Sequence, residues 1–127
     1  MNYKLLIVDD SKLARMAVRK ALNALYPDWT QIEAADAAEA VKAVKEKAPD
    51  IAVLDFNMPG RDGIDLAAEL RASRPGMPVA ILSANRQREI LDRTKAVGAV
   101  FLAKPLTEGA FGKFLKSALR ELNKAQS

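Results

Sequence analysis

Acidic, hydroxyl and ammonium side chains follow four separate apolar runs in this sequence. The runs at residues 3–8, 51–54, 78–82 and 99–103 are followed by Asp9-Asp10, Asp55, Ser83 and Lys104 respectively. Carboxylates that gather at one place repel one another, and a divalent ion with oxygen ligands, such as magnesium, relieves that repulsion. The ammonium and hydroxyl groups can then hold a phosphate. The sequence therefore predicts phosphoryl transfer, in which an aspartate can itself be the nucleophile.

Composition excludes several other kinds of chemistry. The 127 residues include no cysteine and no histidine, so disulfides, thiolate metal sites and a histidine base are ruled out. No apolar run approaches the roughly 20 residues that cross a bilayer. The first apolar stretch ends in two acids, unlike a secretory signal. We therefore expect the cytoplasm as the location and no membrane partner.

The net charge of +4 is concentrated in the last third of the chain. Residues 1–85 carry 11 Lys/Arg and 12 Asp/Glu, whereas residues 86–127 carry 9 and 4. This distribution argues against direct nucleic-acid binding along the chain and indicates one basic face. Ordinary solvation explains such charges, and a docking surface for an acidic partner is the alternative. The basic face comprises Arg86, Arg88, Arg93, Lys95, Lys113, Lys116 and Arg120.

Strand-like apolar runs alternate with amphipathic helices along the whole chain. We predict strands at 3–8, 29–34, 51–54, 78–82 and 99–103, and helices at about 12–25 (with Ser11 as N-cap), 37–48, 64–73, 86–97 and 107–122. This alternation predicts an α/β fold with a doubly wound parallel sheet, formed by residues 1–127 as a single domain. Because the carboxyl ends of parallel strands share one edge, the polar residues should meet there.

These motifs, taken in order, resemble the receiver domains of two-component response regulators, and most closely the stand-alone chemotaxis-regulator type. The resemblance covers residues 3–122 and implies a flavodoxin-like fold with five strands in the order 2-1-3-4-5. It rests on Asp9-Asp10, on Asp55 with Asn57-Met58-Pro59-Gly60 and Gly63, on Ser83-Ala84, and on Lys104-Pro105.

The resemblance implies a role for each residue of the acidic site. Asp55 matches the phosphoacceptor. Asp9 and Asp10 match the acids of a magnesium (Mg²⁺) site, which Asp55 and the backbone carbonyl of Asn57 complete. Lys104 matches the lysine that pairs with the phosphoryl oxygens.

The resemblance also implies a switch and its partners. Ser83 matches the switch hydroxyl, Phe101 matches the coupled switch aromatic, and Ala84 is small where the phosphodonor must approach. An aromatic in an apolar strand is also an ordinary core residue. The donor would be a sensor histidine kinase or a histidine phosphotransfer protein. An unidentified output protein would bind around the fourth helix, the fifth strand and the fifth helix.

Other functions remain open alongside this one. We expect a signalling receiver whose only chemistry is its own phosphorylation and dephosphorylation. Unless the chain is cut from a longer protein that carries an output domain after residue 127, we expect it to act by binding a partner or by passing the phosphate on. A phosphohydrolase with an aspartyl-phosphate intermediate commonly has a second acid two residues after the nucleophile, where this chain has Asn57. A scaffold that is never phosphorylated would be favoured by an incomplete acidic site. A flavin carrier would need a Ser/Thr-rich loop after the first strand.

Overall fold

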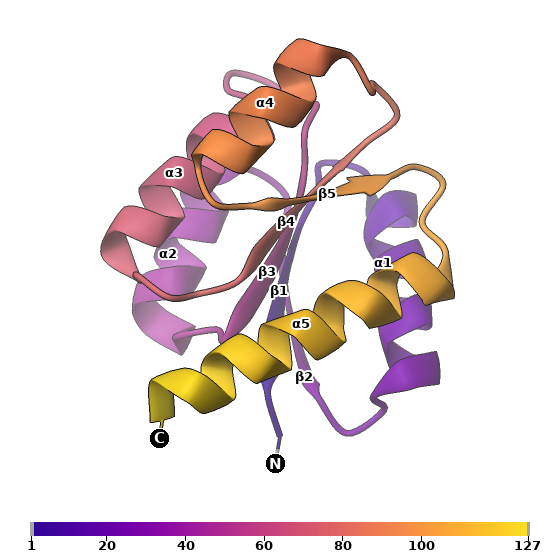
Figure 1. Cartoon of the computed structure of the whole chain (residues 1–127), viewed down its shortest axis with the longest axis vertical. Coiled ribbons are helices and arrows are strands. Elements are labelled where there is room, and N and C mark those ends of the chain that lie inside the picture. The colour runs from indigo at the N-terminus through magenta and orange to yellow at the C-terminus, as the bar shows by residue number, and fades with distance from the viewer. Residues whose placement is uncertain (1, 127) are drawn as a thin grey trace.

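The structure, a computed structural model, describes residues 2–126, and strands and helices alternate throughout this part of the chain (Figure 1). The five strands are parallel and lie in the order β2-β1-β3-β4-β5, which confirms the predicted doubly wound α/β fold. The elements are β1 (Lys4–Val8), α1 (Lys12–Leu25), β2 (Thr30–Ala34), α2 (Ala37–Lys47), β3 (Ile51–Asp55), α3 (Gly63–Ser73), β4 (Val79–Ser83), α4 (Arg88–Ala96), β5 (Val100–Ala103) and α5 (Glu108–Gln126).

Helices cover both faces of the sheet. Figure 1 shows α1 and α5 on one face and α2, α3 and α4 on the other. Successive strand residues enter opposite cores, because side chains alternate along a strand. Thus Leu5 packs with the buried residues of α1 and α5, whereas Leu6 packs with those of α2 and α3. Burial on both faces explains why the central strands are continuous apolar runs.

The register of the sheet aligns the ends of the strands. Val8 pairs with Leu54, so the next residues, Asp9 and Asp55, lie side by side. Asp55 in turn pairs with Leu82, one residue before the end of β4. Strand pairing alone therefore brings the polar residues at the strand ends to one edge of the sheet, called the carboxyl edge below.

Two helix boundaries differ from the prediction by two residues or more. The predicted start of α4 at Arg86 is wrong, because side chains hold the preceding residues in turns. The Asn85 amide donates to Ser83 Oγ at 2.9 Å, and the Gln87 amide donates to Asn85 Oδ1 at 2.9 Å. At the other end of the chain, α5 continues past the predicted end at 122 to Gln126. Among the described residues, none of the helices has the length and apolar character needed to span a bilayer.

Candidate functional site

Three carboxylates converge at the carboxyl edge. One oxygen each from Asp9, Asp10 and Asp55 lies within 4.8 Å of the others. Asp9 and Asp55 are 3% and 5% exposed, whereas Asp10 faces solvent. The structure thus brings together the acids that the sequence predicted as a cluster, from the ends of two neighbouring strands.

Lys104 completes this cluster from the far side of β4. Its Nζ donates to Asp55 Oδ1 at 2.6 Å and lies 3.9 Å from Asp9 Oδ2. Its backbone amide donates to the Ser83 carbonyl at 3.1 Å, which fixes the end of β5 beside β4. The Lys104–Pro105 peptide bond is cis, a point that local sequence cues left undecided. A lysine that bonds to a buried carboxylate is well placed to bond to a group attached to that carboxylate.

Two contacts hold Asp9 that the sequence did not predict. The Ser11 amide donates to Asp9 Oδ1 at 2.9 Å, and Arg15 Nη1 donates to the Asp9 carbonyl at 2.7 Å. The first is a local turn in which an aspartate bonds to the backbone two residues later, so the Asp9–Ser11 spacing could have indicated it. Ser11 also caps α1 as predicted, because its Oγ accepts from the Ala14 amide.

The electrostatics of the cluster favour a bound cation. Burial raises the pKa of Asp9, and the neighbouring charges of Asp55 and Asp10 raise it further, while the Ser11 amide and Lys104 partly offset both effects. Three acids therefore share a site with one lysine contact, and a proton or a cation is needed to balance them. The donor set is oxygen-only, which suits a hard ion such as Mg²⁺.

The remaining predicted residues lie around this cluster. Ser83 is buried at the end of β4 with its hydroxyl bonded to the Asn85 amide, and Ala84 beside it is exposed. Asn57 is exposed in the loop between β3 and α3. Phe101 is half-buried and packs against the core beneath α2, α3 and α4. The roles of Ser83 and Phe101 in the switch, of Ala84 in leaving room for the phosphodonor and of Asn57 as a metal ligand remain predictions.

A glycine allows helix α3 to begin directly behind Asp55. A Cβ on Gly63 would lie 2.2 Å from the Asp55 carbonyl oxygen and 2.9 Å from its carbonyl carbon. The Gly63 amide donates to the Phe56 carbonyl at 2.9 Å, which closes the loop between β3 and α3. The sequence placed Gly63 in the motif but gave no reason for it. The reason is the close approach of two backbone segments.

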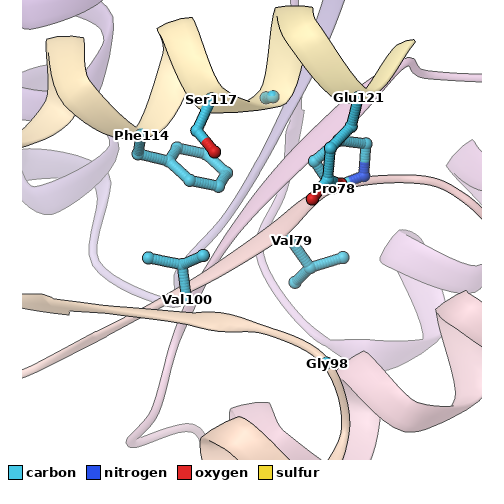
Figure 2. Close-up of a pocket in the computed structure, with 8 residues that line it drawn as sticks. Pro78, Val79, Gly98, Val100, Phe114, Ser117 and Glu121 are labelled. Carbon is cyan, nitrogen blue, oxygen red and sulfur yellow. The ribbon is translucent and has the colours of Figure 1, made fainter. Parts of the chain in front are cut away.

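The cluster opens onto a cleft. A cavity of about 230 Å³ lies between α1 and the residues after β5, and its lining includes Asp9, Lys104, Ala14 and Leu106. A second cavity, shown in Figure 2 between α5 and the amino-terminal ends of β4 and β5, has a volume of about 30 Å³. It lies beside Pro78 and Gly98, at the opposite edge of the sheet. That volume holds only about one water molecule, which is too small for a ligand.

Comparison with known proteins identifies this arrangement. The profile of the response regulator receiver domain matches residues 5–116. The chain belongs to the response regulator receiver domain family. Receiver domains are phosphorylation-dependent signalling switches that bind Mg²⁺ at an aspartate cluster. They interact with histidine kinases or phosphotransfer proteins and with output partners.

Individual receiver domains are similar over most of the chain. Chemotaxis protein CheY-3 of Vibrio cholerae is 35% identical, over 95% of this chain and 95% of that protein. Transcriptional regulatory protein PdtaR of Mycobacterium tuberculosis is 36% identical over 82% of this chain, which spans only 50% of that regulator. The crystallised chemotaxis protein CheY4 of Vibrio cholerae superposes with a TM-score of 0.83 at 28% identity, over 93% of this chain and 99% of that one. These similarities confirm the predicted resemblance.

Proposed function

We propose that this receiver accepts a phosphoryl group from a phosphohistidine donor onto Asp55, with Mg²⁺ bound beside it. The observation that carries this proposal is the bond of 2.6 Å from Lys104 Nζ to Asp55 Oδ1 inside the three-carboxylate cluster. A cation, a buried nucleophile and an ammonium side by side are the parts that phosphoryl transfer requires. The donor is a sensor histidine kinase or a histidine phosphotransfer protein.

The reaction follows from the positions of these groups. A carboxylate oxygen of Asp55 forms a bond to phosphorus while the bond from phosphorus to the donor imidazole nitrogen breaks, and its electron pair stays on the imidazole. Lys104 then pairs with a phosphoryl oxygen. Asp9, Asp10 and the Asn57 carbonyl would hold Mg²⁺, which neutralises charge on the acids and the phosphoryl oxygens. Attack by water on phosphorus breaks the bond to Asp55 and resets the switch.

The surface beside the cluster suits a donor with an apolar contact surface. On α1, Leu13 is 78% exposed and Met16 is 48% exposed, and both are large apolar side chains. The cleft between the same helix and the residues after β5 is lined by Asp9 and Lys104. Burying these side chains on association would be favourable. Ala84, small and exposed, leaves room for the donor on the other side.

The output surface is proposed to comprise α4, β5 and α5. Ser83 would move toward the phosphoryl group and Phe101 would turn inward. These movements would shift the equilibrium between two arrangements of this surface toward the phosphorylated one. The basic residues Arg86, Arg88 and Lys95 are exposed there and suit an acidic partner segment. Arg93 differs from these three residues, because its side chain forms ion pairs with Asp62, the N-cap of α3, and with Asp65 in α3. The chain thus acts as a signalling domain and not as an enzyme with an external substrate.

Mass spectrometry tests the proposal directly. With acetyl phosphate and Mg²⁺, the wild-type protein should gain the mass of one phosphoryl group, and Asp55→Asn should gain none. Asp92→Asn is a matched control, because it removes a carboxylate that is 70% exposed on α4, and it should be phosphorylated like the wild type. Equal phosphorylation of Asp55→Asn would disprove the assignment. Sustained turnover of a generic phosphoester by the wild type would favour a phosphohydrolase instead.

A further inference from the structure

One arginine connects α4 to the start of α3. Arg93 Nη2 lies 2.9 Å from Asp62 Oδ2 and 3.3 Å from Asp65 Oδ1. The side chains of Arg93 and Asp62 are 34% and 27% exposed, so this contact is partly shielded from solvent. The contact of Arg93 with Asp62 and Asp65 is called the Arg93 clasp below.

The clasp is attached to the backbone of the phosphoacceptor. Asp62 is the N-cap of α3, and its second oxygen, Oδ1, accepts from the Asp65 amide at 2.9 Å. The next residue, Gly63, packs so tightly on Asp55 that a Cβ would lie 2.2 Å from the Asp55 carbonyl oxygen. Asp62 therefore has little freedom to move independently of Asp55. A displacement of the loop between β3 and α3 would be transmitted to Arg93, and hence to α4.

Helix α4 is otherwise weakly held. It is short, its buried residues are Ile90 and Thr94, and within the described chain its N-cap Gln87 makes no side-chain capping bond. By contrast, the side chains of Ser11, Asp36 and Asp62 cap α1, α2 and α3. A helix with few buried apolar contacts and no cap is a candidate for motion.

The start of α4 is linked to the proposed switch hydroxyl. Ser83 Oγ accepts from the Asn85 amide, and Asn85 Oδ1 accepts from the Gln87 amide, both at 2.9 Å. If Ser83 leaves this arrangement to bond to a phosphoryl group, the turn before α4 loses its first hydrogen bond. The start of α4 is then free to shift, while Arg93, on the second turn of the helix, is still bound to α3.

We propose that the Arg93 clasp restrains α4 in the unphosphorylated arrangement and so opposes activation. This inference rests on the proposed function of Asp55. A contact that exists only in the unphosphorylated state disfavours binding of a phosphoryl group, and that binding in turn weakens the contact. Removing the clasp should therefore strengthen binding of a phosphoryl group to the same extent that it frees α4. For a partly exposed ion pair we expect a change of about two- to fivefold.

Calorimetric titration with beryllium fluoride, a mimic of the phosphoryl group, measures this coupling in the presence of Mg²⁺. We expect Arg93→Ala to bind the mimic about two- to fivefold more tightly than the wild type. Asp92→Asn is the matched control, because Asp92 lies on the same helix and pairs with Arg88 across solvent, with side chains 70% and 88% exposed. The control should bind like the wild type.

A second variant separates the clasp from a general effect on the helix. Asp62→Asn keeps an oxygen for capping α3 but removes the nearer of the two charges that Arg93 contacts. It should tighten binding in the same direction, and Arg93→Ala combined with Asp62→Asn should add less than the sum of the two single effects. Unchanged or weaker binding by Arg93→Ala would overturn the clasp alone. If the wild type neither binds the mimic nor gains a phosphoryl group by mass spectrometry, the proposed function fails and the clasp proposal fails with it.

Discussion

Replacing Gly63 with alanine should be unusually damaging for so small a change. The added Cβ would lie 2.2 Å from the Asp55 carbonyl oxygen, 2.9 Å from its carbonyl carbon and 3.1 Å from Phe56 Cα. Ordinary contacts of a Cβ begin at 3.4 Å. All three atoms belong to the backbone of β3 and the residue after it, so no side-chain rotation can relieve the clash.

The size of the effect follows from the distance. To reach ordinary contact with the oxygen, the start of α3 and the end of β3 must separate by about 1.2 Å, the difference between 3.4 and 2.2 Å. Because interiors are close-packed, forcing one extra methyl group into such a place costs about 1–3 kcal/mol. The clash involves rigid backbone, so we expect a loss in the free energy of unfolding of about 3 kcal/mol, at the upper end of that range. Phosphorylation should fall as well, since the displaced carbonyl belongs to the phosphoacceptor.

Urea unfolding of Gly63→Ala and Gly109→Ala provides the measurement and its control. Gly109 lies in α5, and a Cβ there would meet nothing within 4 Å. Alanine is the better helix former, so Gly109→Ala should leave stability unchanged or raise it by up to about 1 kcal/mol. The reasoning is refuted if Gly63→Ala unfolds at the wild-type urea concentration, because the close approach of the two backbone segments would then be absent.

Two further predictions concern stability. Phe111 on α5 is fully buried, so Phe111→Ala should lower the free energy of unfolding by about 3–5 kcal/mol in the same urea assay, and a smaller loss would mean that the core collapses around the gap. For Asp9, a raised pKa in the fold means that its contribution to stability is greatest below the ordinary pKa of 3.8 and is lost as pH rises through the pKa of the folded state. Metal-free Asp9→Asn should therefore be more stable than the wild type at neutral pH, and thermal unfolding should show this advantage shrinking as pH falls toward 4.

The sequence was a good guide to the fold because the strands are buried on both faces. Continuous apolar runs such as 51–54 and 78–82 marked the strands directly, and the polar residue after each run marked its end. The parallel arrangement then placed Asp9 beside Asp55, as the register shows. The boundaries of the helices were less accurate, since they depend on side-chain contacts such as that of Ser83 with the Asn85 amide.

Long-range side-chain contacts could not be predicted in the same way. Arg93 appeared to be one of several basic residues on a solvated helix surface, and nothing in its local sequence distinguished it from Arg88. Its partner Asp62 is 31 residues away, and their meeting depends on how α3 and α4 lie across the same face of the sheet. Likewise, Arg15 was expected only as a helix residue, yet it donates to the Asp9 carbonyl. Such contacts require the packing of whole elements, which periodicity does not determine.

The acidic cluster limits the stability of the metal-free fold. Asp9 and Asp55 are buried. Among the described residues, Lys104 is the only basic side chain that forms an ion pair with either of them. The raised pKa of Asp9 shows that the fold holds this carboxylate where its charged form is disfavoured. The β-sheet register and the Gly63 contact nevertheless keep the acids together. A cation that binds the folded state and not the unfolded chain must then add to the free energy of unfolding. The same convergence of acids that destabilises the metal-free fold would thus favour binding of a cation, because the sheet register already brings the carboxylates together.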